Sequence, residues 1–191
     1  MRVIAGKYRS RVLRSLRGRV LRPTSDRLRE TLFDILGASV GGCLFVDAYA
    51  GTGAVGIEAL SRGAAEVTFI EKHAPAATLI RRNLESLGAQ SGVTILAMDA
   101  VRGLHQLAHR RFGDRLQVDF VFLDPPYAAG EEYALSLGYL DESRLLAPAG
   151  RIIVEHRCGF ELPERLAEIE RVRVVEQGDA ALSFYRLARA A

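Results

Sequence analysis

The chain has 191 residues, of which 49% are hydrophobic and 26% are charged, and its formal net charge is +3. This length and composition predict one globular domain that can bury a substantial core without extra cross-links. The sequence has no run of about eighteen apolar residues, which excludes a typical membrane-spanning helix, and it shows no secretory leader pattern, so a cytoplasmic location is expected.

The positive charge is concentrated at the N-terminus. Residues 1–29 contain ten basic side chains and one acidic one, whereas the remainder of the chain carries a net charge of −6. A basic arm on an acidic body favours a polyanionic partner, although a solvated charged face or a transit peptide remains a plainer alternative. We therefore divide the sequence into a basic hairpin extension, residues 1–20, and a main domain, residues 21–191.

The two cysteines, Cys43 and Cys158, lie in or beside apolar runs, with no His or Cys nearby at zinc-ligand spacing. We expect reduced thiols, and no metal site is predicted.

Two β-compatible runs open the chain, at residues 2–5 and 12–16, and they predict an N-terminal hairpin. Pro23-Thr24-Ser25-Asp26 is a turn and helix-capping pattern. Apolar residues then recur at helical spacing, which predicts an amphipathic helix over 26–36 that ends at Gly37.

After residue 43, β-rich runs alternate with helical patterns, which is typical of a parallel sheet covered by helices. The expected strands are 44–47, 67–71, 93–98, 120–123 and 152–155, and the expected helices are 55–61, 75–87, 101–110 and 133–145. Two further strand candidates, 172–175 and 182–187, are too close for a helical crossover and predict an antiparallel hairpin. The predicted fold class is α/β: a Rossmann-like class I methyltransferase with a seven-stranded, mostly parallel sheet, an antiparallel C-terminal hairpin and a small N-terminal β-hairpin extension.

A glycine-rich turn follows the first of these strands. Gly51 and Gly53 allow a tight turn whose backbone N–H groups can approach a ligand, and Gly56 completes a G-x-G-x-x-G pattern. That pattern alone also fits a dinucleotide-binding protein. Asp47 favours S-adenosylmethionine instead, because a carboxylate there could accept a hydrogen bond from the cationic amino-acid end of that cofactor, whereas a pyrophosphate would gain nothing.

Two more carboxylates follow the next strands. Glu71, 24 positions after Asp47, is placed to bind the paired ribose hydroxyls of either cofactor. Asp99 could accept the adenine amino group. A surface position for Glu71 and an N-cap role for Asp99 remain the structural alternatives.

The fourth strand leads directly into Asp124-Pro125-Pro126-Tyr127. Consecutive prolines lack N–H donors and stiffen the loop, which fixes two acceptors, the Asp124 carboxylate and the Pro125 carbonyl. Gripping both hydrogens of an exocyclic amino group would direct the nitrogen lone pair at a methyl donor and stabilise the developing charge. Tyr127 would stack on a flipped-out base. A Pro-Pro turn with a structural Asp cap is the plainer alternative.

Taken together, the Pro-Thr-x-Asp-Arg-x-Arg-Glu run at 23–30, the turn at 47–62 and the Asp-Pro-Pro-Tyr loop resemble the bacterial small-subunit ribosomal RNA guanine-N2 methyltransferases, the RsmD-type family. The resemblance covers nearly the whole chain, and the 23–30 run is its most discriminating part. Two residues depart from the family's usual pattern: Ser10, where glycine is common, and Tyr49, where phenylalanine is common.

The resemblance implies methylation of guanine N2 in 16S rRNA, and recognition of that guanine within an assembling or assembled 30S subunit. It also implies a monomeric enzyme whose basic extension binds RNA. It adds Thr24 and Arg27 as ligand or supporting residues, unless they are purely structural. The expected catalytic residues are Asp124, Pro125 and Tyr127. The expected cofactor-binding residues are Asp47, Ala50, Gly51, Thr52, Gly53, Glu71, Lys72, Asp99, Ala100, Thr24 and Arg27. The expected RNA-binding residues are Arg2, Lys7, Arg9, Arg11, Arg14 and Pro126.

Three other functions remain open from the sequence. The first is another amino-methyltransferase, acting on adenine N6 or a protein glutamine, because both chemistries use a similar proline-rich loop. The second is an NAD-dependent oxidoreductase that uses the three glycines. The third is a catalytically idle RNA-binding assembly factor.

Overall fold

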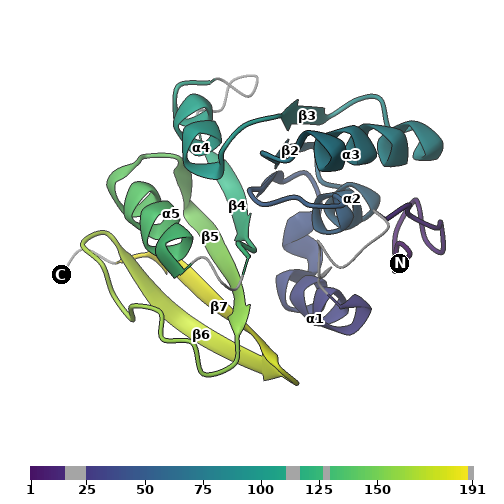
Figure 1. Ribbon diagram of the computed structural model, residues 1–191. Helices are drawn as coiled ribbons and strands as arrows, with labels where there is room; N and C mark the ends of the chain where they lie inside the picture. The colour runs from purple at the N-terminus through teal and green to yellow at the C-terminus, as the bar shows by residue number, and fades with distance from the viewer. Residues whose placement is uncertain (16–24, 111–116, 127–129, 189–191) are drawn as a thin grey trace. The chain divides into compact units, whose positions relative to one another are not determined.

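The computed structural model describes residues 1–15, 25–110, 117–126 and 130–188 (Figure 1). The chain divides into two compact units, residues 1–99 and 100–191. Two residues of the expected site, Thr24 and Tyr127, and the end of the expected run 12–16 lie outside the described residues.

The first unit is built on three parallel strands in the order β3-β2-β1. Strand β1 (Leu44–Asp47) pairs with β2 (Glu66–Ile70), which pairs with β3 (Val93–Leu96). Helix α2 (Ala54–Ser61) packs on β1 and β2, and the unit also contains α1 (Asp26–Leu36), the short 3-10 helix η1 (Gly37–Val40) and α3 (Ala74–Leu87). All four residues of β1 are buried, as expected for a strand covered on both faces.

Local sequence explains where the helices begin. The Ser25 hydroxyl caps α1 by accepting the backbone N–H of Leu28 at 3.1 Å. Pro75 lies in the first turn of α3, where a missing N–H costs nothing. The expected helix over 26–36 is confirmed with both of its bounds.

The second unit contains four strands in the order β4-β5-β7-β6. Strand β4 (Val118–Leu123) is parallel to β5 (Leu146–Arg157), and β5 is antiparallel to β7 (Ala180–Leu187), which pairs with β6 (Ile169–Gln177) in a hairpin. Helices α4 (Ala100–Ala108) and α5 (Gly130–Glu142) contact each other. The expected mostly parallel, seven-stranded α/β fold with an antiparallel C-terminal hairpin is confirmed.

Most of the other boundaries differ from expectation by a few residues, and strand β5 begins six residues earlier than expected. Two of the differences concern the end of α5 and the C-terminal hairpin. The helix expected over 133–145 ends at Glu142, because the carbonyl of Leu145 accepts the backbone N–H of Val118 at 2.8 Å and the chain continues into β5. A short apolar run fits both the helical and the extended period, so pattern alone could not separate them. The C-terminal hairpin is also tighter than expected, with only two residues between β6 and β7.

Residues 1–13 form a small antiparallel pairing rather than two full strands. A single β-bridge joins Arg2 to Val12, flanked by hydrogen bonds from Val3 N–H to the Arg11 carbonyl and from Leu13 N–H to the Met1 carbonyl. At the turn, Ser10 has a φ of 67°, a left-handed conformation that favours glycine. This explains why glycine suits that position better than serine.

In the described part of the chain, no helix is both long and apolar enough to cross a bilayer.

Candidate functional site

Asp47 holds the turn that follows β1. Its side chain is 2% exposed, and its Oδ2 accepts the backbone N–H of Gly56 at 2.9 Å. Gly56 lies in the first turn of α2, where N–H groups have no partner within the helix. The carboxylate therefore joins the end of β1 to the start of α2 and supports the loop between them.

The glycines of this turn serve different purposes. Gly53 has a φ of 79°, and its N–H donates to the carbonyl of Ala50 at 2.6 Å, which closes the turn. A Cβ on Gly56 would lie 2.3 Å from the Phe69 ring, so only glycine allows α2 to pack this closely on β2. Close packing of helix on strand is the role of the third glycine in nucleotide-binding turns.

Glu71, directly after β2, reaches back to the same turn. Its Oε2 accepts the backbone N–H of Gly51 at 2.8 Å, and its Oε1 accepts the N–H of His73 at 2.7 Å. A carboxylate oxygen can accept more than one hydrogen bond, so both oxygens retain capacity for a pair of ribose hydroxyls. The residue that follows, Lys72, is exposed.

The remaining predicted cofactor residues are less closely tied to the turn. Thr52 is buried, and its carbonyl accepts a hydrogen bond from Asn83 Nδ2 at 3.1 Å. Arg27 is exposed on α1. Asp99 is half-buried and directly precedes Ala100, the first residue of α4, which is the position that an N-cap role requires.

The Asp124 loop belongs to the second unit. Strand β4 is buried along its last four residues and ends at Leu123. Asp124 is half-buried, Pro125 is buried and Pro126 is exposed. Since neither proline can donate a backbone hydrogen bond, this stretch offers oxygen acceptors without competing backbone donors.

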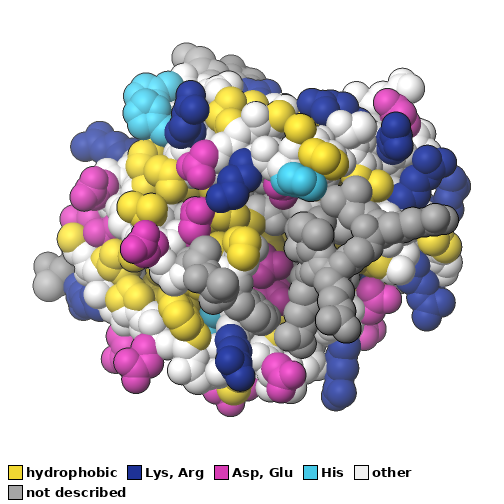
Figure 2. Space-filling model, viewed as in Figure 1, with side chains coloured by type: hydrophobic (Ala, Val, Ile, Leu, Met, Phe, Trp, Pro, Cys, Tyr) yellow, Lys and Arg dark blue, Asp and Glu magenta, His cyan; other side chains and the backbone are white. Residues whose placement is uncertain are grey.

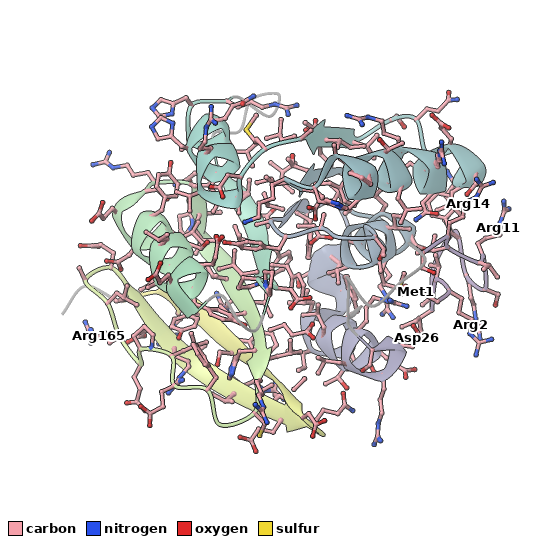
Figure 3. All side chains as sticks on the ribbon, viewed as in Figure 1. Met1, Arg2, Arg11, Arg14, Asp26 and Arg165 are labelled. Atoms are coloured by element: carbon pink, nitrogen blue, oxygen red, sulfur yellow. The ribbon has the colours of Figure 1, made fainter. Side chains whose placement is uncertain are left out.

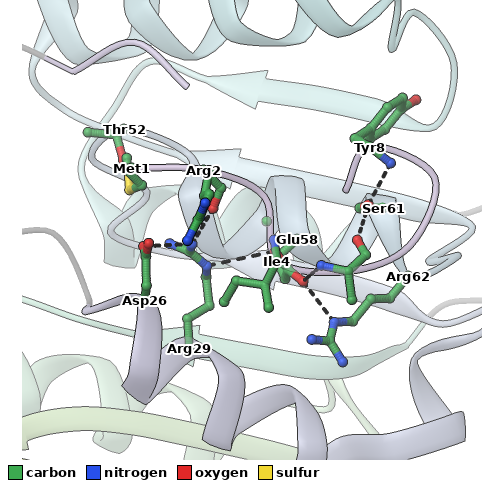
Figure 4. A network of polar contacts seen from close by, with 12 residues as sticks. Met1, Arg2, Ile4, Tyr8, Asp26, Arg29, Thr52, Glu58, Ser61 and Arg62 are labelled. Atoms are coloured by element: carbon green, nitrogen blue, oxygen red, sulfur yellow. Dashed lines mark hydrogen bonds and ion pairs between the residues drawn. The ribbon is translucent and has the colours of Figure 1, made fainter. Parts of the chain in front are cut away.

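A buried carboxylate anchors the N-terminal segment, residues 1–15, on the first unit (Figure 4). Glu58 of α2 accepts the backbone N–H groups of Ile4 at 2.8 Å and Ala5 at 3.0 Å, and Arg62 Nε at 2.9 Å. Its Oε2 also lies 3.8 Å from Nε of Arg29, whose side chain, like that of Glu58, is fully buried. The segment is thus part of the unit's buried polar network.

Arg29 and Ser61 extend this network. Arg29 Nη2 donates to the Arg2 carbonyl at 2.6 Å and to Asp26 Oδ1 at 3.0 Å. The Ser61 hydroxyl accepts the backbone N–H of Tyr8 at 2.9 Å, and its backbone carbonyl accepts that of Lys7 at 2.7 Å. Figure 4 shows the contacts of Arg29 and the hydrogen bond between Tyr8 and Ser61.

Sequence reasoning missed Glu58, Arg29 and Asn83. The sequence did contain a signal for Glu58, which is the one acidic residue in the otherwise apolar and small-residue run of α2. A charged side chain in such a buried run needs a partner. The partner could not be identified, because Ile4 is 54 positions away.

Of the predicted RNA-binding residues, the five basic ones lie at the surface of this anchored segment, and Pro126 belongs to the second unit. Figure 3 shows how three of them project outward, and Figure 2 shows dark blue Lys and Arg side chains gathered at the edge where the segment and α3 lie. The exposed residues are Arg2, Lys7, Arg9, Arg11 and Arg14.

Comparison with solved structures defines the class of protein. The Escherichia coli protein yhhF, described as a candidate methyltransferase, superposes with a TM-score of 0.82 at 30% identity, covering 99% of each chain. An RNA methyltransferase from Salinibacter ruber, solved with S-adenosyl-L-homocysteine, shares the fold with a TM-score of 0.60 at 17% identity over 86% of this chain and 92% of that one. The fold is that of the Rossmann-like methyltransferases.

The particular family follows from sequence. The model of the family described as conserved hypothetical protein 95 matches residues 1–186. Proteins named ribosomal RNA small subunit methyltransferase D are 38% identical in Haemophilus influenzae, over 81% of this chain and 78% of that protein, and 33% identical in Escherichia coli, over 97% and 89%. The chain belongs to this family, which confirms the resemblance to the RsmD type.

Proposed function

We propose that this protein transfers a methyl group from S-adenosylmethionine to the N2 amino group of a guanine in 16S rRNA. The observation that carries the proposal is the Asp124-Pro125-Pro126 loop directly after buried strand β4, in a chain of the RsmD-type family. Family membership and the names of the relatives support methylation of small-subunit rRNA. The choice of guanine N2 rests on the resemblance of the motifs.

The first unit would hold the methyl donor. S-adenosylmethionine supplies an electrophilic methyl group on a sulfonium. The Glu71 carboxylate, already oriented by Gly51 and His73, would accept the two ribose hydroxyls. Asp47 would attract the cationic amino-acid end, and Asp99 would accept the adenine amino group. The residues proposed to line the remaining contacts are Ala50, Thr52, Gly53, Lys72, Ala100, Arg27 and Thr24.

The second unit would hold the acceptor. The amino group of guanine is a poor nucleophile because its lone pair is delocalised into the ring. The Asp124 carboxylate and the Pro125 carbonyl would each accept one of its N–H bonds, which favours a pyramidal nitrogen and stabilises positive charge as the new C–N bond forms. The proton released afterwards would pass to Asp124 or to water. Tyr127 would stack on the flipped-out base, and Pro126 would contact it.

The charge of the N-terminal segment favours RNA as the substrate. Its five exposed basic side chains stand on a backbone that Glu58, Ser61 and Asn83 hold in place. Such side chains would bind phosphates and orient the RNA without reading its sequence. We propose 16S rRNA in an assembling or assembled 30S subunit as the substrate, and a cytoplasmic monomer as the active form.

Methyl transfer from labelled cofactor tests the proposal directly. The full chain is incubated with naked 16S rRNA, 30S particles, DNA and ribosomal protein, and labelled RNA is digested to nucleosides. We expect N2-methylguanosine from rRNA or its particles. Label found only in DNA, in protein or on adenine would overturn the guanine assignment in favour of another amino-methyltransferase.

Calorimetric titration separates the remaining alternatives. We expect S-adenosylmethionine and its demethylated product to bind, and NAD not to bind. Binding of NAD alone would reject the methyltransferase assignment. Binding of RNA with no methyl transfer to any acceptor would instead indicate an assembly factor.

A further inference from the structure

The N-terminal segment is fastened along one side of helix α3. Asn83 Oδ1 accepts the backbone N–H of Arg14 at 2.9 Å, and Asn83 Nδ2 donates to the Arg14 carbonyl at 3.2 Å. Three residues further along the helix, the Ser86 carbonyl accepts a hydrogen bond from Arg11 Nη2 at 2.8 Å. Residues 11–14 therefore run antiparallel to the last turn of α3.

Arg82 lies beside this attachment. It immediately precedes Asn83, and it stands four residues before Ser86. Residues at i and i+4 are neighbours on a helix surface, with Cβ atoms about 5–6 Å apart. Asn83 is buried whereas Arg82 and Ser86 are exposed, so Arg82 occupies the solvent side of the same edge of α3.

This arrangement brings Arg82 near Arg11 and Arg14, which lie 71 and 68 positions before it in the sequence. Figure 3 shows Arg11 and Arg14 beside α3. Within the described residues, neither Arg14 nor Arg82 forms an ion pair with a carboxylate. Arg81 and Glu85 are also exposed on the same helix, so arginines outnumber acidic side chains on this surface.

A positively charged surface with a fixed backbone suits a nucleic-acid phosphate chain. The arginine fork pairs bidentately with phosphate, and a backbone held by Asn83 has little conformational entropy left to lose when RNA binds. Arg11 uses one of its five N–H donors on Ser86, so four remain for phosphate oxygens.

We propose that Arg82 of α3, together with Arg11 and Arg14, forms a phosphate-binding surface for the substrate RNA. This inference rests on the proposed function, because it names a further part of the enzyme that holds the same substrate. Phosphate contacts position RNA without reading bases. Arg82 thus contributes to RNA affinity and leaves the identity of the methylated nucleotide unchanged.

The test compares the full chain with Arg82→Gln, Arg82→Lys and a matched control, Arg173→Gln. Arg173 is exposed on β6 of the second unit, and its substitution removes the same charge. Binding of 16S rRNA is measured across a salt series. One lost phosphate contact should reduce the slope of log K against log salt by about 0.7–0.9, which corresponds to about five- to eightfold weaker binding at 0.1 M salt.

We expect this loss for Arg82→Gln, with most of it restored in Arg82→Lys and none in Arg173→Gln. KM for RNA should rise while kcat and cofactor affinity stay the same. An unchanged slope in Arg82→Gln, an equal loss in Arg173→Gln, or reduced cofactor affinity in Arg82→Gln would each overturn the inference. If the unsubstituted protein fails to methylate any small-subunit RNA, the proposed function fails instead.

Discussion

The backbone N–H of Gly51 donates to the Glu71 carboxylate at 2.8 Å, which ties the turn after β1 to the end of β2. Two residues twenty positions apart, both predicted to bind the cofactor, thus depend on each other. The Glu71 carboxylate holds the glycine turn in shape, and its oxygens can accept further hydrogen bonds. Its observed role in the first unit is structural, and the role in cofactor binding that we propose for it is additional.

Replacing Glu71 with alanine should weaken the binding of S-adenosylmethionine by about 10- to 100-fold. Hydrogen bonds to a charged group contribute about 1.5–3 kcal/mol, and each 1.4 kcal/mol is about tenfold in affinity. Calorimetric titration measures the effect, with Glu85→Ala, an exposed acid of α3, as the control. Equal affinity in the two variants would exclude Glu71 from the cofactor site.

Asp124→Asn should reduce kcat for rRNA methylation by about 10²- to 10³-fold, because the carboxylate would no longer stabilise positive charge on the acceptor nitrogen. Cofactor affinity should change little. Single-turnover methyl transfer gives the rate, and Asp179→Asn in the exposed β6–β7 turn serves as the control. Full activity in Asp124→Asn would show that this carboxylate takes no part in the reaction.

Glu58→Ala should destabilise the protein by about 3–5 kcal/mol, since it removes the buried carboxylate beside Arg29 and leaves only Asp26, whose side chain is half exposed, to pair with that buried guanidinium. It also removes the acceptor for two backbone N–H groups of the N-terminal segment. Urea denaturation measures the loss, and trypsin should cleave after Arg9 or Arg11 faster than in the unsubstituted protein. The exposed Glu142→Ala gives the comparison, and matching midpoints would contradict the prediction.

The same contacts decide which variants can test RNA binding by the N-terminal segment. Deleting residues 1–19 would expose Glu58 and Arg29, so a loss of RNA binding could reflect partial unfolding. Substituting exposed arginines keeps the backbone contacts of the segment intact.

The burial of His156 predicts how the free energy of unfolding changes at acid pH. Burial lowers the pKa of this imidazole below its ordinary value of 6.5, and its Nε2 lies 2.8 Å from the Ser183 hydroxyl. The unfolded chain therefore binds a proton at higher pH than the folded one, so stability falls as pH drops below about 6.5 towards the lowered folded pKa. Thermal melts at pH 7.5 and 5.5 should show a smaller drop for His156→Gln. Equal drops would exclude this histidine as a cause.

Local patterns predicted most of the secondary structure because each signal lies within a short window. The cap at Ser25, the glycines at 51 and 53 and the prolines at 125 and 126 act on their own backbone, whatever the rest of the chain does. Errors arose at Leu145, where a short apolar run suits both helix and strand. The N-terminal pairing was overestimated because β-compatible runs do not reveal how many ladder bonds form.

The sequence by itself thus determined the parallel α/β alternation, the glycine turn, the proline-rich loop after β4 and the family, since these depend on the order and spacing of nearby residues. Only tertiary structure decided what the N-terminal segment rests on. Its contacts join Ile4 to Glu58 and Arg14 to Asn83, across 54 and 69 positions. Burial makes such partners obligatory for a charged or polar group, but which distant residue provides them depends on how the whole chain packs.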